Sequence, residues 1–200
     1  MNPGDDAGEG HSVVLRTQLG GKFLASDAGL FLYKEHLAAQ RIVVEFPRGD
    51  GIVAELASMA LSFVPTPQRT LLSEELDYLR AIRRNPLHLV YNASGSNLGY
   101  MGEGTSIEVL FALRHLKPVV CAYAPKFSNT VPVNVRGILE SRLEELVISN
   151  LARIPGPDLA EHIQAIIRQH RAVALTDAER QICGGEVLRL LRRYRDAIPR

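Results

Sequence analysis

Four glycines lie among polar residues between Asn92 and Glu108, directly before an apolar helical pattern that runs through Leu113. These glycines, at positions 95, 99, 102 and 104, permit tight turns and let backbone amides approach a ligand closely. The pattern predicts a helix with Thr105 as its N-cap, whose first turn offers free N–H groups and a partial positive charge. Such a helix start favours an anion, so we predict a ligand site at this junction of loop and helix.

Glu108 is the candidate reactive group at this junction. Thr105 and Glu108 match the S/T-x-x-E capping box, in which the glutamate accepts a hydrogen bond from the amide of the capping residue. The same position suits a nucleophile, because the helix dipole keeps a carboxylate ionised and presents it to a glycine-lined cleft. The spacing does not separate these two interpretations, and both stay open on these residues.

Five short apolar and β-branched runs are typical of buried parallel strands. They are SVVLRT (12–17), RIVVEFP (41–47), LHLVYNA (87–93), PVVCAYA (118–124) and LVISNL (146–151). Helical patterns separate the runs, for example at 52–63 and 73–83. This alternation predicts a doubly wound α/β fold of the flavodoxin or Rossmann type, with a mostly parallel five-stranded sheet and helices on both faces.

Ligands of such sheets bind beyond the carboxyl ends of the strands, where the strand order reverses. Three glycine-containing loops follow predicted strands, at 17–22, 47–51 and 92–104. The loop after the first strand therefore adds Thr17, Gly20 and Gly21 to the predicted substrate contacts.

The C-terminal third is predicted to be mostly helical. Asp158 and Glu161 form one capping-box pattern, and Thr176 and Glu179 form another. The pair Gly184-Gly185 is predicted to interrupt or kink the last helix. We divide the chain into a flexible tail (1–11), an α/β domain (12–172) and a C-terminal helical extension (173–200).

Composition narrows the possible partners. The 23 Lys and Arg residues nearly cancel the 22 Asp and Glu residues, and a net charge of +1 gives no electrostatic reason to expect a nucleic-acid polymer or an anionic membrane. The two cysteines have no metal-ligand spacing. No apolar run approaches the roughly 20 residues that span a bilayer. We expect a soluble cytoplasmic protein without a metal or cofactor.

The run GYMGEGTSIEVLFAL at 99–113, which is followed by Lys117-Pro118-Val119, resembles the nucleoside 2-deoxyribosyltransferase family. In that family a G-Y-x-G-x-x-x-x-x-E-[IL]-x-[FY]-A-L pattern precedes K-P-V. The likeness extends over residues 12–125 and is specific within 91–120. Family members assemble their sites between subunits, so the resemblance implies a homodimer or a larger homo-oligomer.

The resemblance implies that Glu108 is the nucleophile, which attacks the anomeric carbon of a nucleoside or nucleotide and displaces the base. A covalent glycosyl-enzyme then passes the sugar to a second base or to water. The loops after the first and third strands would hold the substrate through Gly99, Gly102, Gly104 and Thr105. Tyr100 stacks on a base or packs the loop against the sheet, and Asn92 binds a ribose hydroxyl or caps the turn.

The chain departs from the family where acids are expected. Pro86 stands where members usually have an Asp, and a second family acid falls on Gly102. Glu103 is therefore the candidate acid or sugar-hydroxyl contact, and its alternative is an exposed loop carboxylate. Transfer and hydrolysis both stay open. Two further interpretations are a non-catalytic module that binds a nucleotide-derived ligand, and a phosphoribohydrolase of the lysine-decarboxylase-like family, whose loop shares the G-T-x-x-E part.

Overall fold

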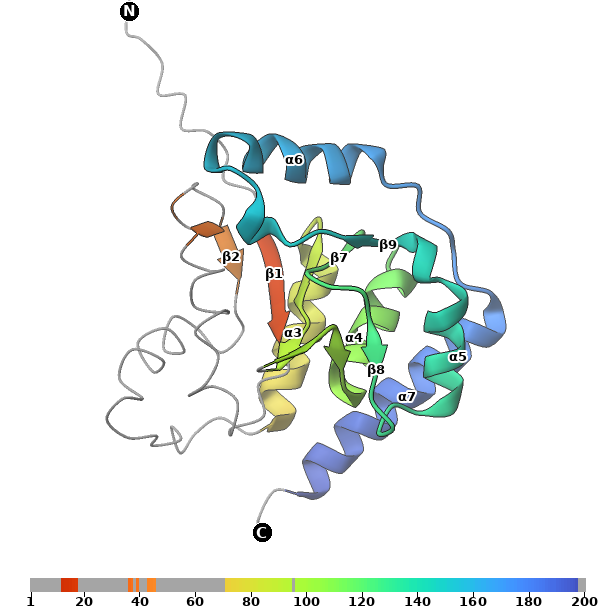
Figure 1. Cartoon of the computed structure of the whole chain (residues 1–200). Coiled ribbons are helices and arrows are strands. Elements are labelled where there is room, and N and C mark those ends of the chain that lie inside the picture. The colour runs from red at the N-terminus through yellow and green to blue at the C-terminus, as the bar shows by residue number, and fades with distance from the viewer. Residues whose placement is uncertain are drawn as a thin grey trace, which may run out of the picture.

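The computed structural model describes residues 12–17, 36–37, 39, 43–45, 71–94 and 96–197, which form the coloured elements of Figure 1. The predicted α/β class is confirmed, since parallel strands combine with helices. A strand lies within each of the five predicted runs: β1 (Ser12–Thr17), β2 (Val43–Glu45), β3 (His88–Tyr91), β7 (Val119–Cys121) and β9 (Leu146–Ile148). The predicted tail (1–11), the predicted helix at 52–63 and the glycines at 20 and 21 lie outside the described residues.

The strands join in the order β2-β1-β3-β7-β9, and each pair of neighbours is parallel. The chain first places β2 on one side of β1 and then adds the later strands on the other side. The strand order therefore reverses between β1 and β3. Thr17 and Tyr91, the last residues of these two strands, are partners in the ladder. The carboxyl ends of β1 and β3 thus lie side by side.

Helices cover both faces of this sheet. Successive strand residues point to opposite faces, and Val90 and Cys121 belong to one buried cluster whereas Leu89 and Val120 belong to another. The first cluster contains residues of α3 (Leu71–Arg84), α4 (Glu103–Arg114), α5 (Val133–Ser141) and α7 (Asp177–Asp196). The second contains residues of α6 (Gly156–Gln169). The sheet thus lies between two buried clusters, and each cluster includes residues of helices.

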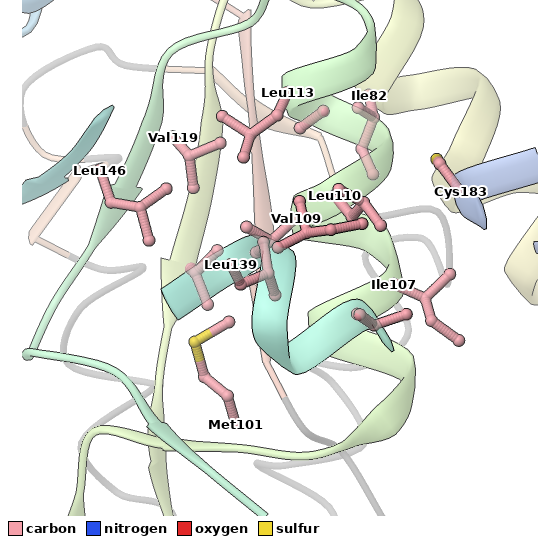
Figure 2. Packing of buried hydrophobic residues seen from close by; sticks show 14 of the residues in the cluster. Ile82, Met101, Ile107, Val109, Leu110, Leu113, Val119, Leu139, Leu146 and Cys183 are labelled. Carbon is pink, nitrogen blue, oxygen red and sulfur yellow. The ribbon is translucent and has the colours of Figure 1, made fainter. Parts of the chain in front are cut away.

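Helix α4 lies at the centre of the larger cluster. It contacts α3, α5 and α7 as well as β3 and β7, and it is buried on most of its circumference. In Figure 2 its Leu110 and Leu113 lie among Ile82 of α3, Leu139 of α5 and Cys183 of α7. A helix that is apolar around most of its circumference is stable only inside a protein. The packing therefore holds the start of α4 in place against the strand ends.

Shorter elements complete the path of the chain. Two-stranded pairings join β4 (Ala93–Ser94) to β5 (Asn97–Leu98) and β6 (Tyr100–Met101) to β8 (Lys126–Phe127). Two 3-10 turns, η2 (Leu143–Glu145) and η3 (Leu151–Arg153), flank β9.

The predicted capping box at Thr176 is confirmed. The Glu179 amide donates to the Thr176 hydroxyl at 3.2 Å, and the Thr176 amide donates to the Glu179 carboxylate at 2.7 Å. The predicted capping box at Asp158 is wrong, because α6 begins at Gly156 after Pro155, without a side-chain cap. A proline in the first turn starts this helix instead.

The predicted interruption at Gly184-Gly185 is also wrong, since α7 runs without a break through both residues. Glycine costs about 1 kcal/mol relative to alanine in a helix interior. Burial of Cys183 and Leu190 against the larger cluster outweighs this cost. The C-terminal helix therefore packs into the same core as α3, α4 and α5.

Substitution of Gly185 with alanine is expected to stabilise the protein by about 0.5–1 kcal/mol, because the new methyl group restricts the unfolded chain. No atom lies within 4 Å of the position that its Cβ would occupy. Urea denaturation measures the effect. Gly184→Ala is the matched control with a smaller gain, since its Cβ would lie 3.1 Å from Nη1 of Arg114. A destabilised Gly185→Ala protein would contradict this account.

Arg142 anchors the start of α7 to the end of α5. Its guanidinium donates to Glu179 at 2.7 and 3.0 Å and to Glu145 at 2.7 Å, and the residue is 8% exposed. The hydrogen bond from Arg142, together with hydrogen bonds from Thr176 and the charge of Arg142, lowers the pKa of Glu179 from 4.5 to about 2, against the opposing effect of burial. The ion pair therefore joins two helices that are distant in the chain.

The lowered pKa of Glu179 makes stability depend on pH. A carboxylate with a depressed folded-state pKa contributes stability above its unfolded pKa and loses it as the pH falls. We expect wild-type stability to fall between pH 5 and pH 2, and Glu179→Gln to lack about 1.5–3 kcal/mol of that pH-dependent part. Urea denaturation at several pH values measures it. Asp177→Asn, which removes a 91% exposed carboxylate from the same helix, is the control. An unchanged pH dependence in Glu179→Gln would refute the assignment.

Candidate functional site

The side chain of Asn92 ties together three segments at the carboxyl edge of the sheet. Its amide nitrogen donates to the carbonyls of Tyr123 at 2.7 Å and Gly99 at 3.3 Å, and its amide oxygen accepts from the Tyr123 amide at 2.9 Å. The Gly99 amide also donates to the Asn92 carbonyl at 2.7 Å. These bonds match the predicted turn-capping role of Asn92. Contact with a ribose hydroxyl stays a prediction.

At Gly99 the backbone of the glycine loop lies close to the segment that follows β7. Its φ of +93° lies in the region that L side chains rarely adopt. A Cβ at this position would lie 2.1 Å from the carbonyl oxygen of Ala124. The Lys126 amide donates to the Gly99 carbonyl at 2.7 Å and continues the pairing of the two segments. Only glycine fits this crossing without displacing backbone.

The residues after Gly99 lead the chain into α4. Tyr100 is half-buried and pairs through its backbone with Lys126, while Met101 is fully buried in the larger cluster. This placement is consistent with the packing role predicted for Tyr100, and stacking on a base stays a prediction. Gly102 is extended, with φ −88° and ψ −173°, and occupies the N-cap of α4.

The predicted helix start at Thr105 is wrong, because α4 begins at Glu103. The Ser106 amide donates to the Gly102 carbonyl at 3.0 Å, which closes the first helical turn ahead of that position. Thr105 is therefore the third helical residue and Glu108 the sixth. A capping box requires the glutamate three residues after the cap. Thr105 and Glu108 therefore do not form a capping box, and this interpretation of Glu108 is excluded.

Glu108 lies in the interior of the protein. It is 0% exposed, and the neighbouring polar residues Thr105 and Ser106 are 2% and 0% exposed. A buried carboxylate costs several kcal/mol unless other groups compensate its charge. Thr105, Ser106 and Glu108 thus place three polar residues among the buried residues of a helix that are otherwise apolar.

Glu75 is a second buried carboxylate that the sequence analysis did not single out. It is 2% exposed and lies in α3, which packs against α4. Helix α3 begins at Leu71, so Glu75 lies in its second turn. The available signal was helical spacing, since Glu75 shares a face with the buried residues Tyr78, Leu79 and Ile82. Among the buried residues of the described ranges, Glu75 and Glu108 are the two carboxylates.

Glu103 is held by the C-terminal helix. Its carboxylate forms ion pairs with Arg189 at 2.5 Å and Arg193 at 2.6 Å, and its side chain is 14% exposed. Burial raises the pKa of Glu103, but the hydrogen bonds and charges of the two arginines outweigh this effect and lower it. Glu103 is the first residue of α4. It therefore lies in a helix rather than on an exposed loop. An ionised Glu103 suits a hydrogen-bond acceptor better than a proton donor.

The remaining predicted contacts lie near the same edge of the sheet. Thr17 ends β1 opposite Tyr91, and Gly104 is half-buried in the first turn of α4. Within the described ranges, no group of three His, Cys, Asp or Glu residues is arranged to hold a metal ion. None of the described helices is long and apolar enough to cross a membrane.

Comparison of the chain with protein-family models, with curated proteins and with solved structures revealed no match.

Proposed function

We propose that this protein is an enzyme acting on the N-glycosyl bond of a nucleoside or nucleotide, by deoxyribosyl transfer or by hydrolysis, with Glu108 as nucleophile. The observation that carries the proposal is the complete burial of Glu108 in the second turn of a helix that follows a glycine loop. Because α4 begins at Glu103, Glu108 is not the glutamate of a capping box at Thr105. The type of reaction that we propose comes from the resemblance of residues 99–119 to the deoxyribosyltransferase pattern.

The place of the loop in the sheet supports the proposal. We propose a doubly wound five-stranded sheet, which the strand order and the helices on both faces favour. In such sheets the ligand crevice opens at the carboxyl ends of the strands between which the order reverses. These strands are β1 and β3, and the glycine loop follows β3.

The proposed reaction has two displacements. In the first, a carboxylate oxygen of Glu108 forms a bond to the anomeric carbon while the bond between sugar and base breaks, and the base takes the bonding electron pair and a proton from water. In the second, another base or water attacks the same carbon, gives up its proton to the solvent and releases the carboxylate, so the configuration is retained. Glu75 is a second buried carboxyl group, in the helix α3 that packs against α4. Pro86 and Gly102 stand where the family pattern has acids.

The proposal requires movement. Glu108 has no exposed surface, so a sugar can reach it only when the residues that cover it are displaced. Enzyme sites commonly close around their substrates by loop motion.

From the resemblance of residues 99–119 to the deoxyribosyltransferase family, we also propose that the protein acts in the cytoplasm as a homodimer or a larger homo-oligomer.

Incubation with deoxyribonucleosides, ribonucleosides and their 5′-monophosphates tests the proposed activity. Chromatography would detect free base, both alone and with a second base as acceptor. We expect base release from at least one substrate, and a new nucleoside if the enzyme transfers the sugar. An absence of turnover across the panel would overturn the proposal.

A second candidate is a non-catalytic module that binds a nucleotide-derived ligand. It is favoured by the ion pairs that hold Glu103 and by the hydrogen bonds that occupy the amide of Asn92. Calorimetry separates the two functions. Tight binding of a nucleotide without release of its base would support the module, whereas turnover would exclude it.

A further inference from the structure

Helix α7 lies beside α4 and runs in the opposite direction (Figure 1). Near the start of α7, the Arg180 carbonyl accepts a hydrogen bond at 3.4 Å from Arg114, the last residue of α4. Further along α7, Arg189 and Arg193 form ion pairs with Glu103, the first residue of α4. The second half of α7 (186–196) therefore lies against the start of α4, where the glycine loop leads into the candidate site.

The first half of α7 is firmly anchored. Its Glu179 pairs with Arg142 at the end of α5, and the two side chains are 17% and 10% exposed. Thr176 forms the capping box with Glu179. Ion pairs that water hardly reaches are screened less by salt than exposed pairs. This half of the helix is thus fixed to the end of α5.

The second half of α7 is held by groups that water reaches more easily. The side chains of Arg189 and Arg193 are 45% and 49% exposed, although that of Glu103 between them is 14% exposed. Ion pairs of exposed side chains contribute little to stability. Each half buries one residue, Cys183 in the first and Leu190 in the second. The exposed ion pairs therefore make the second half the less firmly attached of the two.

Gly184 and Gly185 separate the two halves. Neither glycine has a positive φ, and no atom lies within 4 Å of the position that a Cβ of Gly185 would occupy. Neither the backbone conformation nor close packing therefore requires glycine at position 185. Glycine weakens a helix interior, and sharp bends in helices occur at pairs of small residues such as glycine. A hinge accounts for the pair, because a hinge needs residues that absorb a change of backbone conformation.

We propose that the second half of α7 is a hinged lid, which bends away at the glycine pair when its two arginines release Glu103. The structure has the closed form, in which α7 is unbroken through both glycines. In the open form, the start of α4 loses the two ion pairs that hold it. Opening also removes Leu190 from the buried cluster, so the lid is closed most of the time.

The lid packs near the candidate nucleophile. Leu190 belongs to the same buried cluster as Ile107 and Val109, the residues on either side of Glu108 in α4. Glu108 has no exposed surface, so a substrate reaches it only after some part of its cover moves. The lid provides this movement. Its role in admitting a substrate rests on the proposed function, whereas the opening itself does not.

Amide hydrogen exchange of the whole chain, measured separately on peptides from the two halves of α7, tests the lid. A detached half-helix of this length is unstable in water, so each opening lets its amides exchange. In Arg189→Gln/Arg193→Gln we expect exchange over 187–196 to accelerate at least about threefold, and exchange over 177–183 to stay within about twofold of the wild type. Equal acceleration of both halves would mean a general loss of stability and would overturn the lid, as would unchanged exchange.

Arg192→Gln/Arg195→Gln is the matched control, because it removes two exposed arginines from the same half of α7. Neither arginine forms an ion pair with α4 within the described ranges, and Arg195 pairs with the neighbouring Asp196. We expect this variant to exchange like the wild type. If it accelerated exchange as much as the variant of Arg189 and Arg193, the ion pairs with Glu103 would not hold the lid.

Gly185→Ala tests the hinge. Alanine strengthens the helix at the bend without meeting another atom, so exchange over 187–196 is expected to slow at least about threefold. Gly137→Ala, whose added Cβ in α5 also meets no atom within 4 Å, is the control and should leave this exchange unchanged. Unchanged or faster exchange in Gly185→Ala would exclude the hinge at the glycine pair.

Enzyme kinetics separates the lid from the proposed reaction. If only the open form admits a substrate, kcat/KM is proportional to the open fraction. We expect Gly185→Ala to lower kcat/KM for base release by the factor by which it slows exchange, and Arg189→Gln/Arg193→Gln to raise it by the factor by which it accelerates exchange. An unchanged kcat/KM would refute the role of the lid in admitting a substrate. Selective exchange of the lid without any base release would support the lid and contradict the proposed function instead.

Discussion

Glu108→Gln is expected to reduce the rate of base release by a factor on the order of 10³ or more, because it removes the nucleophile that divides the displacement into two steps. Glutamine has nearly the size and shape of glutamate, so the interior position stays filled. The amide cannot form the covalent glycosyl-enzyme in the same way. Rapid quenching and intact-protein mass spectrometry should show the sugar adduct on the wild type and no adduct on the variant.

The burial of Glu108 requires a stability control for this experiment. The residue is 0% exposed, so its replacement can change folding as well as chemistry. Urea denaturation of Glu108→Gln establishes that the protein compared in the assay is folded. Ser106→Ala is a matched variant, since Ser106 is equally buried in the same helix. A folded Glu108→Gln protein that releases base at the wild-type rate would exclude Glu108 as the nucleophile.

The α/β class followed from short-range patterns in the sequence. Each of the five apolar runs contains a strand, because β-branched residues bounded by turn residues favour buried strands in most contexts. The capping box at Thr176 was equally local, since its two hydrogen bonds lie within four residues. Features determined by neighbouring residues are therefore the ones that the sequence could predict.

The errors occurred where contacts distant in the chain decide the structure. Thr105 and Glu108 satisfy a capping motif, but the pairing of β6 with β8 positions Gly102 to begin the helix earlier. Gly184-Gly185 was expected to break a helix that core packing holds together. The ion pairs of Glu103 join residues at least 86 positions apart. Patterns of neighbouring residues do not predict such ion pairs.

Gly99→Ala is expected to destabilise the protein by about 3–5 kcal/mol, the sum of an unfavourable backbone conformation and a steric overlap. Alanine at a φ of +93° is strained. Its Cβ would overlap the Ala124 carbonyl oxygen, which lies 2.1 Å away. That oxygen cannot move freely, because neighbouring backbone groups are tied by hydrogen bonds from Asn92 to Tyr123 and from Lys126 to Gly99.

The same substitution tests whether the glycine loop and the end of β7 form one unit. If they do, Gly99→Ala should lower the free energy of unfolding and also accelerate amide exchange at Lys126, whose amide donates to the Gly99 carbonyl. Gly137→Ala is the control, because no atom lies within 4 Å of its added Cβ in α5. We expect that variant to be at least as stable as the wild type. If Gly99→Ala were as stable as the wild type, the loop would not need the close contact at Gly99. The candidate site would then lack the rigid support that positions the start of α4.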